Sequence, residues 1–226
     1  MNDQVYFLFD FDSTFIQCES LAVLADIALE GHPQKQERLN MIADITQEAM
    51  EGRYDFQESL KDRFALLSLQ KQHLQQTIDI LKTKITPSFL RHVNFFKKHA
   101  TNIYIITGAL IEIVYPIVQP FGMMRDHIFA NRLIYDFEGN ILGYDHNNLL
   151  AQDQGKVKCV HQLKLNGHVI FIGDGYNDYE VRSAGLAHTF VALTENIKRE
   201  AVVKVADIVI NDLEGLFITC NISDEE

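Results

Sequence analysis

The chain contains few cysteines, glycines and prolines. Its three cysteines, Cys18, Cys159 and Cys220, are far apart and form no Cys-x-x-Cys pair. Neither a disulfide framework nor a zinc site is therefore expected, and the reducing cytoplasm is the expected compartment. Only 12 glycines and 4 prolines occur among the 226 residues, which excludes a collagen-like or linker-rich chain.

Positive charge is also scarce. The chain has 20 Lys and Arg against 31 Asp and Glu, which gives a net charge of −11 at pH 7. Proteins that bind nucleic acid or anionic membranes need basic patches to neutralise phosphate groups, so neither partner is expected. A small phosphorylated metabolite remains compatible with this charge, because one local lysine and a metal ion can outweigh the overall field.

Long apolar runs are absent as well. No basic segment precedes the short apolar run Val5–Phe9, and the later apolar stretch 103–118 is interrupted by polar residues, a glycine and a proline. Neither a signal peptide nor a membrane span is therefore expected. The composition, 47% hydrophobic and 23% charged, is typical of a globular chain with a sizeable core.

Short, continuously apolar segments alternate with helical patterns along most of the chain. Strands are predicted at Val5–Phe9, 103–106, 169–172 and Ile208–Ile210, with a weaker candidate at Thr189–Leu193. Helices are predicted at residues 88–99, 110–119, 156–164, 177–184 and 196–205. Strands that are apolar on both faces and alternate with helices predict an α/β fold with a mostly parallel sheet.

One long stretch after the first predicted strand breaks this alternation. It has no convincing strand, and its helical patterns lie at residues 21–29, 36–50, 56–67 and 72–81. These patterns predict a helical insert between the first two strands. Asp55, followed three residues later by Glu58, resembles a capping box at the start of the third of these helices.

A second irregular stretch, residues 131–144, contains two short apolar segments around a Gly139-Asn140 pair. Glycine and asparagine tolerate the backbone angles of a tight turn, so a small β-hairpin is predicted here. The tail 223–226 is expected to fray.

Asp10 and Asp12 directly follow the first predicted strand, within the sequence DFDST. Residues i and i+2 of an extended chain point the same way, so both carboxylates project from the carboxyl end of a strand, where open α/β sheets bind ligands. Adjacent carboxylates repel each other unless a cation or a shared proton intervenes. Mg²⁺ suits this task, because it prefers a few carboxylates with water and phosphate. The alternative is a polar strand exit whose side chains form turns.

A second acidic motif, GDGYND, follows the predicted strand 169–172 and contains Asp174 and Asp178. Its glycines permit a tight turn and close approach of the backbone. A metal ion held by Asp10 needs further oxygen ligands, and Asp174 is placed to supply one. Taken alone, the motif is equally compatible with an ordinary Asp-Gly turn.

Two further groups lie beside predicted strand ends. Thr107 and Gly108 follow the strand 103–106, where a hydroxyl and free N–H groups can bind phosphate oxygens, although Thr107 alone also suits a helix cap. Lys156 can neutralise a carboxylate–phosphate pair or simply be solvated. Combined with the acidic motifs, these groups are the parts of phosphoryl transfer through a covalent carboxyl-phosphate intermediate.

The ordered set of DFDST, Thr107, Lys156 and GDGYND resembles the haloacid dehalogenase-like (HAD) superfamily, and within it the phosphoserine phosphatases. The segment ITQEAMEGRYDFQESLKDR is similar to the cap of that subgroup, and FANRLI to its hairpin region. The resemblance implies a Rossmann-like core of residues 1–16 and 85–226, a helical cap of residues 17–84, and Mg²⁺-dependent hydrolysis of a phosphomonoester.

The resemblance also implies a role for each motif residue. Asp10 would be the nucleophile, and Asp12 would protonate the leaving alkoxide and then activate the water that hydrolyses the aspartyl-phosphate. Mg²⁺ would be held by Asp10, the backbone carbonyl of Asp12, and Asp174. Around the phosphate, the resemblance places Thr107 and Lys156 on its oxygens, Gly108 and Asn177 close by, and Asp178 orienting Lys156 or metal-bound water.

Four residues of the insert would select the substrate. In the resemblance Glu19 receives the serine ammonium group and Arg63 clamps the serine carboxylate, a bidentate task that suits a planar guanidinium. Met50 and Phe56 would line the same pocket. O-phosphoserine is therefore the favoured substrate.

Three departures from the phosphoserine phosphatase pattern affect the substrate more than the reaction. Thr107-Gly108-Ala109 stands where these enzymes usually have Ser-Gly-Gly, the stretch 29–42 looks longer than usual, and the stretch 156–174 looks short. Two alternatives stay open: a phosphatase or phosphotransferase for another small phosphomonoester, and a catalytically silent HAD-fold protein that binds or regulates. The silent protein should lack a motif acid, yet all of them are present.

Overall fold

The computed structural model describes residues 4–220, so the tail 223–226 lies outside the described residues. The strands are β1 (Val5–Phe9), β2 (Ile103–Leu110), β3 (Ile128–Asn131), β4 (Leu133–Tyr135), β5 (Ile141–Tyr144), β6 (His168–Gly173), β7 (Thr189–Leu193) and β8 (Ile208–Ile210). The α-helices are α1 (Ser20–Ala28), α2 (Lys35–Met50), α3 (Phe56–Ala65), α4 (Lys71–Leu81), α5 (Pro87–Arg91), α6 (Val93–Lys98), α7 (Ile111–Val118), α8 (Gly155–Leu163), α9 (Tyr176–Ser183), α10 (Glu200–Val203) and α11 (Leu213–Cys220). Short 3₁₀ turns lie at Lys82–Lys84, Gln119–Phe121, Arg125–His127 and Leu149–Ala151.

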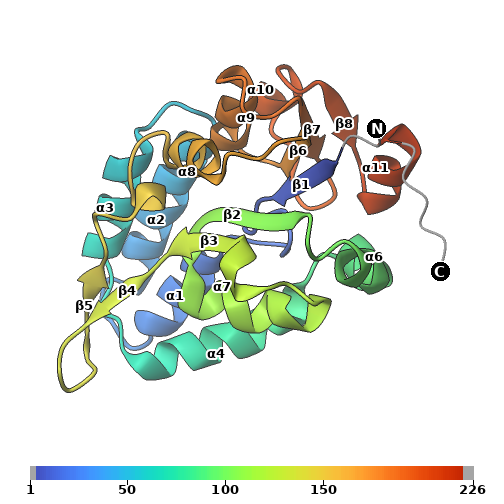
Figure 1. Ribbon diagram of the computed structural model, residues 1–226. Coiled ribbons are helices and arrows are strands. Elements are labelled where there is room, and N and C mark those ends of the chain that lie inside the picture. Colours follow the sequence, from blue (N-terminus) through green and yellow to red (C-terminus); the bar gives the residue numbers. More distant parts are fainter. Residues whose placement is uncertain (1–3, 221–226) are drawn as a thin grey trace.

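Six strands form one parallel sheet in the order β3-β2-β1-β6-β7-β8 (Figure 1). β1 is central, and its residue Phe7 pairs with Ile103 of β2 on one side and Ile170 of β6 on the other. The two remaining strands, β4 and β5, form a separate antiparallel hairpin. The predicted α/β fold, with a Rossmann-like parallel sheet and a small hairpin, is confirmed.

Apolar side chains cover both faces of the sheet, which is why its strands are apolar throughout. On one face Phe7 and Phe9 of β1 belong to a buried cluster with Phe89 and Phe96 of α5 and α6. On the other face Leu8 belongs to a second buried cluster that includes side chains of α8 and α9. Alternate residues of one strand therefore anchor opposite helical layers.

The helices α1 to α4 all come from the stretch between β1 and β2, as the sequence predicts. Figure 1 shows α1, α2 and α3 grouped on the same side of the molecule as the β4–β5 hairpin. The hairpin packs on this group through Tyr144, whose ring centroid lies 4.6 Å from that of Phe64. Asp55 caps α3 by accepting a hydrogen bond from Glu58 N at 3.1 Å, as predicted.

The two chain segments that connect these helices to the sheet run side by side. Ile16 and Ile85 form an isolated antiparallel bridge. Gln17 N donates to Lys84 O at 2.8 Å, and Thr86 N donates to Phe15 O at 3.0 Å. The insert therefore leaves and re-enters the sheet at one place.

Several predicted elements differ from the structure. The predicted helix 88–99 is two short helices, because His92 leaves the helical region with ψ of 35°. The predicted helix 196–205 is reduced to Glu200–Val203. Residues 128–131, whose last residue we assigned to the hairpin, form the edge strand β3, and the carboxyl-terminal helix α11 was not predicted.

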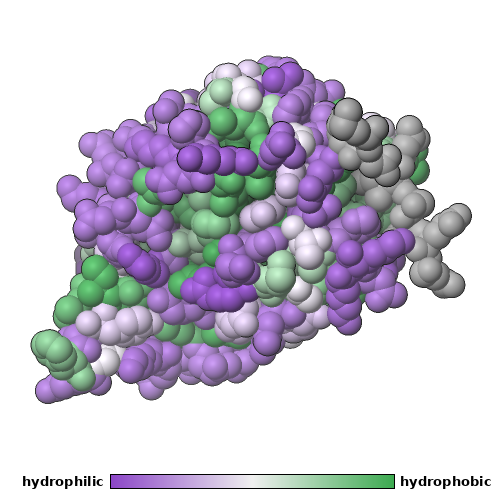
Figure 2. Space-filling view, viewed as in Figure 1, coloured by the Kyte–Doolittle hydropathy of each residue, from purple (hydrophilic) through white to green (hydrophobic). Residues whose placement is uncertain are grey.

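Among residues 4–220, no helix is both long enough and apolar enough to cross a membrane. Figure 2 shows a largely hydrophilic face with apolar side chains at the hairpin on its lower left. Phe137 and Leu142 of this hairpin are exposed.

Candidate active site

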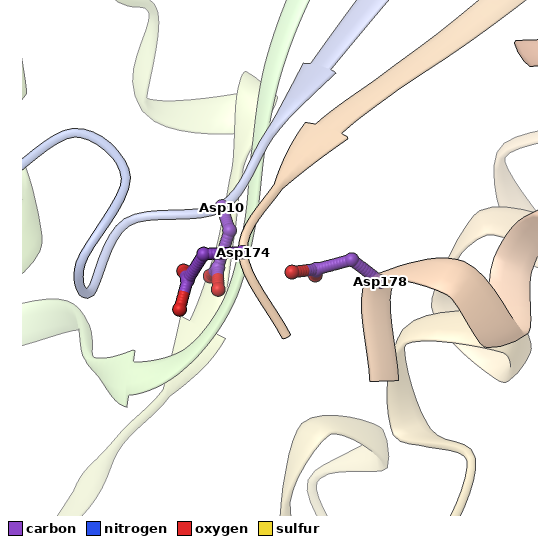
Figure 3. A group of neighbouring side chains, drawn as sticks. All are labelled: Asp10, Asp174 and Asp178. Atoms are coloured by element: carbon purple, nitrogen blue, oxygen red, sulfur yellow. The ribbon is translucent and has the colours of Figure 1, made fainter. Parts of the chain in front are cut away.

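Three acidic side chains converge at the carboxyl ends of β1 and β6. Asp10 follows β1 and Asp174 follows β6, and these neighbouring strands are tied by a 2.9 Å bond from Asp10 N to Ile172 O. Asp178 points toward them from the first turn of α9 (Figure 3). All three are buried, and one carboxylate oxygen from each lies within 4.8 Å of the others. Parallel pairing of the two strands thus brings together the two acidic motifs of the sequence.

Lys156 is the cation beside this cluster. Its Nζ, on α8, lies 2.9 Å from Asp10 Oδ1 and 2.6 Å from Asp178 Oδ1, and the residue is only 5% exposed. Burial opposes its charge, but Asp10 and Asp178 outweigh that effect and raise the pKa of Lys156 above its usual value. The lysine therefore stays positively charged next to Asp10.

Burial disfavours the charged forms of Asp174 and Asp178. Burial is the main cause that raises the pKa of Asp174 to about 7, against the opposing effect of Arg199. Burial likewise raises the pKa of Asp178 to about 8, although Lys156 acts in the opposite direction. A bound cation would favour the ionised forms of both carboxyl groups and so lower these pKa values.

The donor atoms at this place fit Mg²⁺. They are carboxylate oxygens only, which are the ligands of a hard cation, whereas structural zinc sites use cysteine and histidine. Asp10, Asp174 and Asp178 converge without any rearrangement. The side chain of Asp12 turns away from them, so a contribution from Asp12 would have to come from its backbone, as expected from the resemblance.

The Asp12 side chain is held at the start of α1. Its Oδ1 accepts from Ser20 N at 2.9 Å and its Oδ2 from Ser20 Oγ at 3.0 Å. Burial, with a further contribution from the nearby charge of Glu19, raises the pKa of Asp12 well above its usual value. Such a carboxyl group can hold a proton near neutral pH and donate it to a leaving group.

A narrow cavity opens beside Asp10. It is lined by all the predicted site residues except Asp174 and Asp178, namely Asp10, Asp12, Glu19, Met50, Phe56, Arg63, Thr107, Gly108, Lys156 and Asn177. One side of the wall comes from the segments around the sheet, with Asp10, Asp12, Thr107, Gly108, Lys156 and Asn177, and the other from the helical insert, with Glu19, Met50, Phe56 and Arg63. The structure therefore brings the two groups of predicted residues into one space.

Arg63 is buried in this cavity without an anionic partner. Its guanidinium donates to Ser59 O at 3.1 Å, Thr46 Oγ1 at 3.3 Å and Ser59 Oγ at 3.4 Å, all of them neutral groups. Within residues 4–220, no carboxylate forms an ion pair with it. Burial lowers the pKa of Arg63 from its usual value. The site thus presents a desolvated cation toward the cavity, suited to an anionic group of a ligand.

Glu19 occupies another part of the same wall. Its Oε1 accepts from Ser13 Oγ at 2.7 Å, and Arg199 Nη2 lies 3.5 Å from the same atom. These contacts fix the carboxylate at the entry to α1, so that it faces the cavity together with Arg63.

Thr107 and Gly108 lie within β2, where the sequence predicts a turn after the strand. The strand continues to Leu110 with an irregular register after Ile106, and Thr107 Oγ1 accepts from Ala109 N at 3.1 Å. Thr107 does not cap α7, whose first flanking residue is Leu110. A glycine is needed at 108, because a Cβ there would lie 2.5 Å from Cζ of Phe56.

Asn177, at the start of α9, also faces the cavity. Its Oδ1 is buried and has no hydrogen-bond partner among residues 4–220. A buried polar atom without a partner is costly, and a ligand in the cavity would supply one.

Arg199 is a site residue that was not predicted from the sequence. Its guanidinium is buried beside the acidic cluster, with Nε 3.0 Å from Asp174 Oδ2. The signal that could have found it is its place in the loop that follows the predicted strand Thr189–Leu193, at the same edge of the sheet as the other site residues.

Comparison with known proteins agrees with this geometry. A family model described as haloacid dehalogenase-like hydrolase matches residues 6–184. The chloroplastic phosphoserine phosphatase of Arabidopsis thaliana is 30% identical over 92% of this chain and 69% of its own length. A crystal structure of a phosphoserine phosphohydrolase-like protein from Francisella tularensis is 30% identical, with a TM-score of 0.85 over 97% of this chain and all of that chain.

A second solved structure is described as a phospho-aspartyl intermediate analogue of phosphoserine phosphatase. It is 25% identical, with a TM-score of 0.74 over 97% of this chain and 99% of that chain. The extent of the family match and the 30% identity over most of both chains show the family. The chain belongs to the haloacid dehalogenase-like hydrolases, is similar to their phosphoserine phosphatases, and is a phosphoric monoester hydrolase.

Proposed function

We propose that the protein hydrolyses O-phosphoserine to serine and phosphate with Mg²⁺, through an aspartyl-phosphate on Asp10. One observation carries the proposal. A single cavity holds the groups for phosphoryl transfer, Asp10 and Lys156, opposite a carboxylate, Glu19, and an unpaired guanidinium, Arg63. The charges of these groups suit the functional groups of a phosphorylated amino acid, which carries a phosphate, an ammonium group and a carboxylate.

In the first step a carboxylate oxygen of Asp10 attacks phosphorus, and the bond between phosphorus and the serine oxygen breaks. Asp10 Oδ1 is fixed by Phe11 N at 2.7 Å and by Lys156 at 2.9 Å, so we expect Oδ2 to be the attacking oxygen. Lys156 offsets the repulsion between the anionic nucleophile and the phosphate. Asp12 gives its proton to the departing serine oxygen, a contribution of roughly 10²–10⁴-fold.

Mg²⁺, held by Asp10, Asp174 and the backbone carbonyl of Asp12, would supply charge neutralisation at the phosphate oxygens. Thr107, Gly108 and Asn177 would complete the phosphate site with hydrogen bonds, and Asp178 keeps Lys156 in place.

In the second step water attacks phosphorus and displaces the carboxylate of Asp10. Asp12, now ionised, accepts the proton of that water and so returns to its starting state. Phosphate leaves, and Asp10 is regenerated. Atoms and protons balance over the two steps, because the proton given to serine is recovered from water.

We propose that residues 17–84 act as a cap that closes over this reaction. The present arrangement is closed, since Phe56 lies against Gly108 and Gln57 N donates to Asp153 Oδ1 at 3.1 Å. A closed cap excludes bulk water from the first step, and it must open to exchange substrate and product. The paired segments at Ile16 and Ile85 are the natural hinge.

The substrate follows from the cavity wall. Glu19 would receive the ammonium group of serine, and Arg63 would bind its carboxylate in place of the neutral contacts it makes now. Met50 and Phe56 would pack on the short carbon chain. The phosphoserine phosphatases among its relatives support this assignment. Three unpaired cysteines suit a reducing compartment such as the cytoplasm.

The test is release of phosphate from O-phosphoserine by purified protein with Mg²⁺. The wild type should release it well above an Asp10→Asn control and lose activity when EDTA removes the metal. Phosphoethanolamine, which has no carboxylate, should be a poor substrate. Activity confined to esters without an amino acid moiety would instead identify another small phosphomonoester as the substrate. That outcome is compatible with Thr107-Gly108-Ala109, whose extra methyl groups leave less space beside the phosphate than the usual Ser-Gly-Gly.

A further inference from the structure

Arg199 is a buried cation that no step of the proposed reaction uses. The residue is 6% exposed. Its guanidinium bridges two carboxylates with different proposed tasks, Asp174 at the metal site and Glu19 at the amino-group site. Burying a charge is costly unless the charge is paired with an opposite one. Arg199 is paired with two carboxylates of the site, so we expect it to act on that site.

The loop that carries Arg199 is fixed by its neighbours in the chain. Asn196 Nδ2 donates to Thr86 Oγ1 at 2.7 Å and lies within 3.3 Å of three carbonyl oxygens between Ser13 and Ile16. Glu195 accepts from Ser88 N at 3.0 Å. The loop is thus attached to both segments that lead into the helical insert, and its position is not free to drift.

Both carboxylate oxygens of Asp174 accept hydrogen bonds from the protein. Oδ1 accepts from Thr14 Oγ1 at 3.0 Å, and Oδ2 accepts from Arg199 Nε at 3.0 Å. An incoming divalent cation would have to share or take one of these oxygens. Thr14 is neutral, so the guanidinium is the group that repels the cation.

We propose that Arg199 is the built-in counter-cation of the metal site, which competes with Mg²⁺ for Asp174. This inference rests on the proposed Mg²⁺ site. Before Mg²⁺ binds, the guanidinium neutralises Asp174 and so reduces the repulsion among the three buried carboxylates. When Mg²⁺ binds, the guanidinium gives up its bond to Asp174 Oδ2 and is retained nearby by Glu19. Arg199 is therefore a positioning residue that sets the affinity for metal.

Arg199→Gln tests the competition directly. Titration calorimetry with MgCl₂ alone, on protein first stripped with EDTA, should show a dissociation constant lower than that of the wild type by about tenfold, the scale expected for one charge opposite a divalent ion. The melting temperature without metal should fall, and the rise caused by Mg²⁺ should be larger than in the wild type.

Two variants serve as controls. Arg199→Lys keeps the charge and should keep a nearly wild-type affinity. Arg182→Gln removes an arginine that pairs with Asp207 at 2.7 Å and is more than a third exposed, and it should leave Mg²⁺ binding unchanged. Unchanged or weaker binding by Arg199→Gln overturns the inference, and so does equal tightening by Arg199→Lys.

A measurement on the wild type covers the case in which Arg199→Gln does not fold. The Nε–H signal of Arg199 in an NMR spectrum should move on addition of Mg²⁺, while that of Arg182 stays in place; an unmoved Arg199 signal at saturation overturns the inference. Phosphoserine hydrolysis and Mg²⁺ binding by the wild type are recorded in parallel. If both fail, the proposed function fails; if both hold and Arg199→Gln gains no affinity, only the competition fails.

Discussion

Arg63→Met should make the protein more stable and a worse phosphoserine phosphatase. The arginine is 4% exposed, and its hydrogen-bond partners are all neutral groups. Its loss leaves no new unsatisfied hydroxyl, because Thr46 Oγ1 still donates to Ile42 O at 2.7 Å and Ser59 Oγ still donates to Phe56 O at 2.9 Å. Methionine fills much of the same space without a buried charge, so we expect the free energy of unfolding to rise by about 1–2 kcal/mol, on the scale of the gains measured when buried ion pairs are replaced by apolar residues.

The same change removes the proposed partner of the serine carboxylate. A hydrogen bond to a charged group contributes about 1.5–3 kcal/mol, which corresponds to a loss of about 10–150-fold in kcat/KM for O-phosphoserine. p-Nitrophenyl phosphate has no carboxylate, so its kcat/KM should change little. Arg63 would thus be retained for binding at a cost in stability.

Urea denaturation and steady-state kinetics on both substrates measure the two effects. Arg38→Met is the matched control, since Arg38 also lies in the insert but donates to Leu66 O and does not line the cavity. It should leave the ratio of the two kcat/KM values unchanged. The reasoning is refuted if Arg63→Met destabilises the protein and slows both substrates equally, because the arginine would then be structural.

Three further changes have defined outcomes. Asp12→Asn should lower kcat/KM for O-phosphoserine by about 10²–10⁴-fold but lower that for p-nitrophenyl phosphate less, since nitrophenolate leaves without a proton and kcat/KM reports only the step that forms the aspartyl-phosphate; equal losses in kcat/KM would exclude the acid role. Gly108→Ala should raise KM by pushing Phe56 away, and adding Phe56→Leu should restore part of it; a wild-type KM for Gly108→Ala would contradict the close contact. Phe15→Ala should cost about 3–5 kcal/mol in urea denaturation, because Phe15 is fully buried against Phe89 and Phe121; a loss below 1 kcal/mol would show that the core collapses around the gap.

The sheet could be predicted because its strands are buried on both faces. A run such as Val5–Phe9 is apolar without alternation, and only a sheet covered by two layers accounts for that pattern. The acidic motifs could be placed for the same reason, since polar residues that directly follow such a strand must lie at its carboxyl end. However, no local pattern in the sequence indicates that β1 and β6 are neighbours in the sheet. That Asp174 lies close to Asp10 followed from the chemistry expected of a shared metal ion and was strengthened by the family resemblance, not from any local pattern.

The features that the sequence did not predict depend on contacts between distant segments. Arg199 looks like any surface arginine until folding places it beside Asp174 and Glu19, 25 and 180 residues away in the chain. The short helices α5 and α6 depend on packing against the sheet rather than on a long periodic pattern. Thr107 continues β2 because its neighbour Ile106 pairs with β3, a strand too short to stand out in the sequence.

Asp10 should carry the phosphoryl group during turnover, and a trapping experiment can detect that covalent intermediate. Protein mixed with O-phosphoserine and Mg²⁺ is quenched in acid within one turnover, reduced with borohydride, digested and analysed by mass spectrometry. Borohydride reduces an acyl phosphate on Asp10 to homoserine. We therefore expect homoserine at position 10 in the wild type mixed with substrate, and no homoserine in a sample without substrate. Rapid phosphate release with an unmodified Asp10, or with the label on another residue, would contradict it.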